Sequence, residues 1–131
     1  MSEVLELKQE SQLQHLEEES CAGPVLLYKH SSRCGTSTWA QRELEAFRRE
    51  AGAEAPLVAE LDVVEHRALA QEVARRYGVR HQSPQLLLLR DRQVVWHGSH
   101  DDLERSAIAA AVTSSARATV ESIHQSTHKG E

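Results

Sequence analysis

Along this chain, short continuous runs of apolar residues alternate with longer segments in which apolar residues recur every three or four positions. The segment VLLYKH at 25–30 is apolar almost throughout and follows the chain-breaking AGP, as is typical of a buried parallel strand. Beyond it the period changes, because Ala40, Leu44, Phe47 and Ala51 recur at steps of four, three and four residues and share one helical face. A buried strand is therefore expected to lead into a long helix.

The same two patterns predict the remaining elements. LVAELDV predicts a second buried strand, and helical spacing follows it as far as Gly78, which should end that helix. LLLLR and QVVWHG, separated by Asp-Arg, predict a hairpin, and Asp101 or Asp102 should cap a last helix. Strands are thus expected at residues 2–7, 25–30, 57–63, 86–90 and 93–98, and helices at 8–20, 36–51, 65–77 and from Asp101 or Asp102 onward.

This order, β-α-β-α-β-α-β-β-α, belongs to the α/β class. Strand–helix alternation implies right-handed crossovers and parallel strands, and the late hairpin adds antiparallel strands. A mixed central sheet flanked by helices is therefore expected. The order is that of the thioredoxin-like fold with an extra N-terminal strand and helix. We expect residues 1–112 to form this thioredoxin-like domain and residues 113–131 to form a helix extension and a frayed polar tail.

The composition limits the classes of function. The 131-residue chain has a formal net charge of −5, which argues against general binding to nucleic acid or anionic membranes, since both need a basic surface. No apolar run approaches the length of a membrane span, and the first ten residues show no secretory signal. The eight histidines lack the paired spacing of a zinc site, so no metal is expected. Two cysteines without a signal favour a reducing cytoplasm.

Cys34 is the candidate reactive group. It lies just beyond the first central strand and at the entry to the long helix, where chemistry gathers in open α/β sheets. Unpaired backbone N–H groups and the helix dipole favour the thiolate there, and Thr36 and Ser37 can donate to the sulfur. A free cysteine is also commonly a small buried apolar residue, but the strand end, polar neighbours and helix start together favour a nucleophile. Cations that could make its surroundings positive are Lys29, His30, Arg33, Arg80 and His81.

Ser83–Pro84 is the second landmark. Proline cannot donate to a sheet, so one directly before QLLLL belongs at the first position of a strand. In this respect the chain resembles the thioredoxin superfamily, in which a cis-proline before the third central strand faces the active cysteine. The resemblance implies a cis bond at Pro84 and a substrate paired with the adjacent backbone.

Three further segments carry a closer resemblance: PVLLYKHSSRC at 24–34, GVRHQSPQ at 78–85 and VVWHGSH at 94–100. They are similar to the YtxJ-type bacilliredoxins, the monothiol branch associated with bacillithiol, over roughly residues 3 to 112. Family members usually carry Thr-Cys-Pro-Ile-Ser at the active site. This chain carries Arg33-Cys34-Gly35-Thr36-Ser37. Losing the proline loosens the helix start and leaves an extra backbone N–H near the sulfur, which changes the tuning of the thiol.

The resemblance implies a thiol-disulfide oxidoreductase of the cytoplasm. Cys34 would attack a mixed disulfide between a client protein and bacillithiol, and would hold the small thiol until a second thiol removes it. Bacillithiol is then the co-substrate, bacillithiolated client proteins are the partners, and no tightly bound cofactor is implied. The residues implied to bind the substrate are Arg33, Gly35, Thr36, Ser37, His81, Ser83 and Pro84.

Cys21 is expected to be structural or incidental. It precedes the strand at 25–30, whereas Cys34 follows that strand. A strand of this length, at about 3.3 Å per residue, separates the two by about 20 Å. A disulfide tolerates at most about 7 Å between Cα atoms, so Cys21 is a poor resolving cysteine within one chain.

Two alternatives stay open. The segment CGTS resembles the Cys-Gly-Phe-Ser of monothiol glutaredoxins, which share a 2Fe–2S cluster between two chains, but WHGSHDDL lacks their Gly-Gly-Cys-Asp. The other alternative is a non-catalytic thioredoxin-like binding module with an inert Cys34. Fold position alone does not assign a role to His97 or His100.

Overall fold

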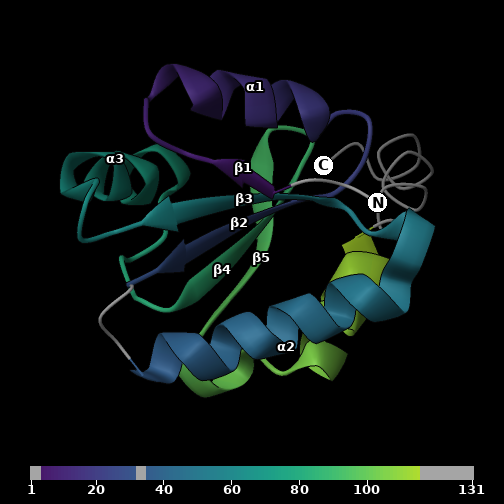
Figure 1. Ribbon diagram of the computed structural model, residues 1–131. Helices are drawn as coiled ribbons and strands as arrows, with labels where there is room; N and C mark the ends of the chain where they lie inside the picture. Colours follow the sequence, from purple (N-terminus) through teal and green to yellow (C-terminus); the bar gives the residue numbers. More distant parts are fainter. Residues whose placement is uncertain (1–3, 32–34, 116–131) are drawn as a thin grey trace.

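The structure is a computed structural model that describes residues 4–31 and 35–115, with residues 35–37 described by their backbone alone. Helices and strands alternate along the chain in the expected order, and the sheet lies between two layers of helices (Figure 1). Residues 105–115 are helical as well. The elements are β1 (Val4–Glu6), α1 (Ser11–Glu19), β2 (Val25–His30), α2 (Gly35–Ala51), η1 (Gly52–Glu54), β3 (Leu57–Asp62), α3 (Arg67–Tyr77), β4 (Gln85–Arg90), β5 (Gln93–Ser99) and η2 (His100–Asp102).

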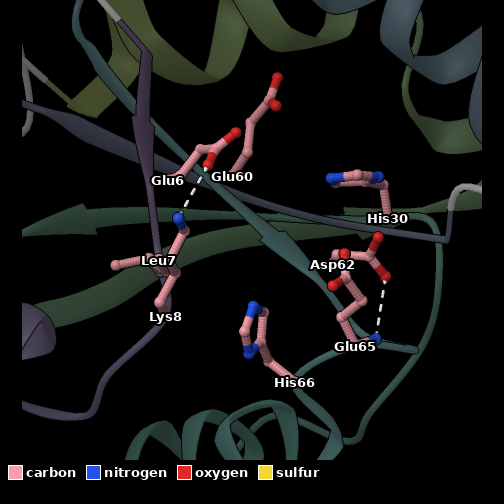
Figure 2. A pocket seen from close by; sticks show the side chains of 8 residues that line it. All are labelled: Glu6, Leu7, Lys8, His30, Glu60, Asp62, Glu65 and His66. Carbon is pink, nitrogen blue, oxygen red and sulfur yellow. Dashed lines mark hydrogen bonds and ion pairs between the residues drawn. The ribbon is translucent and has the colours of Figure 1, made fainter.

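The five strands form one mixed sheet in the order β1-β3-β2-β4-β5. β1 and β2 pair in parallel with β3, while β4 pairs antiparallel with both β2 and β5. The carboxyl ends of the parallel strands meet at one edge, where His30 of β2 and Asp62 of β3 are in register (Figure 2). The expected α/β class and thioredoxin-like order of elements are confirmed.

Helices cover both faces of the sheet (Figure 1). α1 and α3 lie on one face, where Leu27 of β2 belongs to their buried cluster. α2 and the helical residues 105–115 lie on the other face, with Tyr28 of β2 in the second cluster. Because β2 is buried on both faces, its sequence is a continuous apolar run rather than an alternating one. The expected inward face of α2 is confirmed by the burial of Leu44 and Phe47.

Left-handed backbone occurs at the end of α3 and in the β4–β5 hairpin. Gly78 ends α3 at φ 65°, and its N–H donates to the Ala74 carbonyl, as its position predicted. In the hairpin, Asp91 and Arg92 have φ of 53° and 69°, the combination that matches the twist of a two-residue turn. Ser20, at the end of α1, anchors this turn, because its carbonyl accepts the Asp91 N–H and its hydroxyl accepts the Arg92 N–H.

The last helix does not begin where the sequence predicted, so the expected cap at Asp101 or Asp102 is wrong. Both residues lie in η2, where the Asp102 carboxylate accepts the N–H of Ser99 at 3.1 Å. The helix starts at Arg105, whose N–H donates to the Glu43 carboxylate of α2 at 2.9 Å. A neighbouring helix thus supplies the acceptor that a local cap would have supplied.

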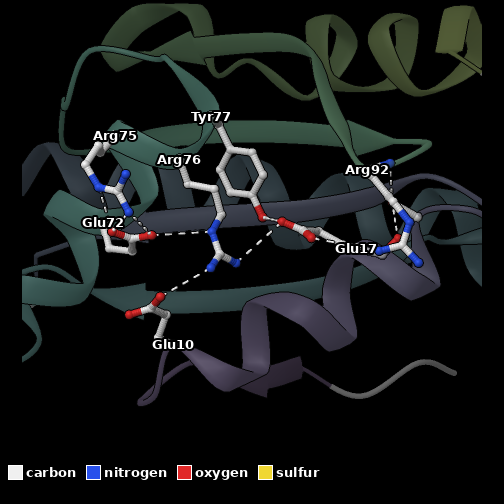
Figure 3. A network of polar contacts seen from close by, with 8 residues as sticks. Glu10, Glu17, Glu72, Arg75, Arg76, Tyr77 and Arg92 are labelled. Atoms are coloured by element: carbon white, nitrogen blue, oxygen red, sulfur yellow. Dashed lines mark hydrogen bonds and ion pairs between the residues drawn. The ribbon is translucent and has the colours of Figure 1, made fainter.

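A network of charged side chains ties α1 to α3 and to the hairpin (Figure 3). Glu17 accepts a hydrogen bond from the Tyr77 hydroxyl at 2.7 Å and forms ion pairs with Arg76 at 3.5 Å and Arg92 at 4.0 Å. Burial and this bond to Glu17 raise the pKa of Tyr77. Arg76 also reaches Glu10 at 3.3 Å. Because the Glu17 side chain is 19% exposed and Glu10 is 61% exposed, water screens the contacts of Glu17 less.

We expect Glu17→Gln to lower the free energy of unfolding by about 1–2 kcal/mol, because it removes a charge that three side chains share. The matched substitution Glu10→Gln should change it by less than about 0.5 kcal/mol, since that carboxylate is exposed and meets Arg76 alone among the described contacts. Urea unfolding of both variants gives the comparison. Equal losses would contradict the central place of Glu17 in the network.

One lysine lies inside the core. Lys29 of β2 is 0% exposed and follows Leu27 on the face that packs against α1 and α3. Burial lowers the pKa of Lys29 to about 8, because a charged ammonium is costly to remove from water. The folded protein therefore loses this proton at a lower pH than the unfolded chain does, whose lysine titrates near 10.5.

This difference predicts a pH-dependent stability. Below about pH 8, Lys29 is protonated in both the folded and the unfolded protein, so the cost of burying its charge is fully present. Between about pH 8 and 10.5 the folded protein has released the proton and the unfolded chain has not, so the free energy of unfolding rises with pH. From about pH 7 to about pH 9.5, the wild type should gain about 2 kcal/mol relative to Lys29→Met. Urea unfolding across this range measures the gain, and the exposed Lys8→Met is the matched control. A pH-independent difference between wild type and Lys29→Met would refute the titration.

Candidate functional site

The end of β2 and the start of β4 lie at one edge of the sheet (Figure 1). β2 ends at this edge, and β4 begins there because it runs antiparallel to β2, with Lys29 in register with Gln85. α2 begins at Gly35, five positions after the end of β2. Arg33 and Cys34 lie outside the described residues.

The Ser83–Pro84 peptide bond is cis, as predicted, and directly precedes β4. Pro84 is buried, and its carbonyl accepts the backbone N–H of His100 at 3.1 Å. The Ser83 Oγ is buried and has no hydrogen-bond partner among the described residues. A buried hydroxyl without a hydrogen-bond partner lowers the free energy of unfolding by about 1–3 kcal/mol. At the sheet edge where β4 begins, a bound substrate can supply the missing partner.

Beneath this segment lies a buried polar chain. The Lys29 ammonium donates to Gln85 Oε1 at 2.8 Å, and Gln85 Nε2 donates to the Arg80 carbonyl at 3.0 Å. Gln85 is 1% exposed and follows Pro84 directly. The two bonds therefore fasten the segment that carries the cis bond to the end of β2.

The segment before β4 also borders a cavity of about 320 Å³. His81 is largely exposed and forms part of the cavity wall. The part of its ring that is shielded from water and the positive charge of Lys29 both lower the pKa of His81. The other lining residues come from the β3–α3 connection and α3: Val63, Val64, Arg67, Ala70 and Gln71. This side of the edge combines apolar walls with the cation of Arg67.

On the other side of β2 the same edge is acidic (Figure 2). A recess of about 350 Å³ opens between the ends of β1, β2 and β3, lined by Glu6, Leu7, Lys8, His30, Glu60, Asp62, Glu65 and His66. Lys8 lies 3.7 Å from Glu6, and burial raises the pKa of Glu60. Since carboxylates outnumber ammonium groups here, His30 lies among acidic side chains. That it helps to make the surroundings of Cys34 positive stays a prediction.

The described residues thus bring together part of the predicted site. Ser83 and Pro84 lie at the edge where Lys29 meets Gln85, and His81 lies on the segment leading to them. Gly35, Thr36 and Ser37 form the first turn of α2, with only their backbone described. Sequence reasoning missed Gln85. The signal that could have found it was a lysine inside an apolar strand, which needs a buried acceptor.

Cys21 lies at the opposite end of β2. It follows α1, and its exposed thiol is in no disulfide and donates to the Glu17 carbonyl at 3.6 Å. That Cys21 is structural or incidental stays a prediction, and its place before β2, away from the cis-proline segment, agrees with it.

No group of three or more histidine, cysteine, aspartate or glutamate side chains in residues 4–31 and 38–115 is arranged to hold a metal ion. Within the described part of the chain, no helix has the length and apolar character needed to cross a membrane.

Solved structures with the same arrangement are thioredoxin-like. A protein assigned as a candidate oxidoreductase with a thioredoxin fold is 28% identical and superposes with a TM-score of 0.74, covering 82% of this chain and 92% of its own. A thioredoxin variant from Halobacterium salinarum is 25% identical (TM-score 0.65; 88% and 94% covered). Thioredoxin from Fasciola hepatica is 20% identical (TM-score 0.67; 85% and 98% covered), a likeness of fold.

The model of one protein family, the monothiol bacilliredoxin BrxC, matches residues 5–108. This span contains the described sheet from Leu5 onward and the segment with the cis-proline. It agrees with the resemblance seen in the strand at 25–30 and in the residues around Pro84. The chain therefore belongs to the monothiol bacilliredoxin family, whose members are thiol oxidoreductases with the thioredoxin fold.

Proposed function

We propose that this protein removes bacillithiol from mixed disulfides on cytoplasmic proteins, with Cys34 as the nucleophile. The observation that carries the proposal is the position of the Ser83–Pro84 segment beside the end of β2, the strand that leads within four residues to Cys34. Family membership supports the chemistry, and the two-cysteine composition supports the reducing compartment.

The reaction is a thiol–disulfide exchange. The Cys34 thiolate attacks the bacillithiol sulfur of the mixed disulfide, a new disulfide forms between them, and the bond to the client sulfur breaks. The client leaves as a thiolate that takes up a proton. A second thiol then attacks the disulfide on Cys34 and restores the free cysteine, so one cysteine in this chain is enough.

The start of α2 supports Cys34 as a thiolate. The helix begins at Gly35, so the cysteine immediately precedes a helix of 17 residues, whose dipole and free N–H groups favour an anion. Gly35, in place of the family's proline, adds one backbone N–H there. We assign the hydroxyls of Thr36 and Ser37 as further donors to the sulfur.

The segment before β4 is assigned to the substrate. Backbone at Ser83 would pair with the mixed disulfide, and the unpartnered Ser83 hydroxyl adds a donor. Bacillithiol carries a malate group, so its carboxylates need cations close to the sulfur. Arg33 adjoins Cys34, and Arg80 and His81 lie on the segment that Gln85 fastens to β2.

Cysteine variants test the nucleophile. Cys34→Ser should abolish release of bacillithiol from a client, whereas Cys21→Ser, a matched change at an exposed thiol outside the site, should leave the rate within about twofold of wild type. Intact mass of one bacillithiolated client, followed with time, measures release. Activity in Cys34→Ser, or its loss in Cys21→Ser, would refute the monothiol mechanism. An inert Cys34 would instead support a binding module, and visible absorbance of the purified protein an iron–sulfur carrier.

Arginine variants test the carboxylate contacts. Replacing Arg33 and Arg80 with Gln should slow release of bacillithiol by on the order of tenfold or more, because a charge-assisted contact to a carboxylate is worth about 1.5–3 kcal/mol. The same variant should act normally on a client carrying 2-mercaptoethanol, which has no carboxylate. Arg75→Gln, on the exposed side of α3, is the matched control. Equal slowing on both clients would argue against a carboxylate site.

A further inference from the structure

We propose that His100 is a positioning residue for substrate binding: its backbone and its imidazole together hold residues 82–84 in the conformation in which the backbone at Ser83 pairs with the substrate. The inference rests on the proposed function, because it takes the Ser83 backbone as the part of the site that binds the mixed disulfide. It gives a role to a residue that the exchange reaction itself does not use and that need not touch the substrate.

His100 lies beside the segment that leads into β4. Because β4 and β5 pair antiparallel, the residue that follows β5 lies opposite the residue that precedes β4. The His100 N–H accordingly donates to the Pro84 carbonyl at 3.1 Å. The His100 Nε2 lies 3.2 Å from Gln82 Oε1, and the imidazole donates in this bond because an amide oxygen can only accept. One residue therefore holds the chain on both sides of Ser83.

Residues 80–84 have few other hydrogen bonds. In the part of the chain that the structure describes, three reach this segment: the two from His100 and one from Gln85 Nε2 to the Arg80 carbonyl. The Ser83 hydroxyl has no partner there. The bond from Gln85 holds the segment only at Arg80, so the polar contacts of residues 82–84 with the described chain come from His100.

The turn that carries His100 is anchored in the core. Leu103 is 1% exposed and belongs to the apolar cluster between the sheet and α2. The Leu103 N–H donates to the His100 carbonyl at 3.2 Å, and the Asp102 carboxylate accepts the Ser99 N–H at 3.1 Å. These bonds close η2 around His100, so its contacts to residues 82–84 start from a fixed turn.

His100 makes both contacts from left-handed backbone. Its φ is 54°, a value that residues with a side chain adopt rarely. The residue is exposed, so its imidazole fills no space in the core. Strained backbone persists where the surrounding structure enforces it, and it clusters at functional sites. An exposed side chain on strained backbone, bonded to the segment assigned to the substrate, points to positioning and not to packing.

His100→Gly tests the imidazole contact. It keeps the backbone bond, because glycine adopts φ 54° without strain. Residues 82–84 should then move more, so a smaller fraction of the protein has the binding conformation, and KM for release of bacillithiol should rise about three- to fivefold. The value of kcat should stay within about twofold, since the bound complex is the same. The urea midpoint should stay close to wild type because no core contact is lost, which separates positioning from a loss of stability.

Three further variants test whether the contact to Gln82 carries the effect. His100→Gln should return KM to within about twofold of wild type, because its amide nitrogen can donate to the same oxygen. Gln82→Ala should raise KM as His100→Gly does, and the double variant should be no worse than either single variant, as expected for two ends of one bond. Asp101→Gly is the matched control and should leave KM unchanged. It places glycine in the same turn, at an exposed residue that has no hydrogen bond or ion pair with the described residues.

A measurement without substrate tests the positioning directly. Relaxation of ¹⁵N in the Ser83 N–H gives its order parameter, which is about 0.85 for rigid backbone and below about 0.6 for flexible backbone. We expect His100→Gly to lower this order parameter from the rigid toward the flexible range. Asp101→Gly should keep the wild-type value.

The outcomes separate this inference from the proposed function. A lower Ser83 order parameter together with a raised KM in His100→Gly supports the inference. An unchanged order parameter, or an unchanged KM, overturns it while the exchange reaction stands. A wild-type protein that releases no bacillithiol from its client overturns the proposed function, and this inference with it.

Discussion

Burial of β2 on both faces is the constraint on which the rest of the structure depends. One cluster of apolar side chains packs on each face of this strand. The exposed fraction is therefore at most 1% for each of Val25, Leu26, Leu27 and Tyr28. A strand held in this way cannot slip by one residue without turning its side chains to the wrong layer. Its end, from which the chain leads to Cys34, is fixed by the core and not by the loop that follows.

The antiparallel direction of β4 turns this fixed end into a site. Because β4 begins where β2 ends, residues 56 positions apart in the sequence meet there, as the bond between Lys29 and Gln85 shows. A parallel strand in the same place would put the Ser83–Pro84 segment at the opposite edge. The hairpin with β5 adds support from a third segment, since the His100 N–H donates to the Pro84 carbonyl.

Local patterns determined much of this architecture in advance. The apolar run at 25–30 and the helical spacing after it match β2 and α2, and the cis bond at Pro84 was expected from the family resemblance together with its place before a strand. The capping of the last helix by Glu43 and the bond between Lys29 and Gln85 could not be predicted, because each joins residues far apart in the sequence. The acidic recess beside His30 was hidden for the same reason, because its carboxylates come from Glu6 and from residues 60–65, which are far apart in the sequence.

That recess gives the edge an uneven charge, which bears on how a substrate approaches. On the β1 and β3 side, carboxylates such as Glu60 and Asp62 face the opening, whereas the β4 and α3 side carries the cations Lys29 and Arg67. A ligand with carboxylates would be repelled on the first side and attracted on the second, and the low dielectric around a buried charge strengthens both effects. This difference in charge favours a carboxylate on the β4 side of the edge over one beside the acidic recess.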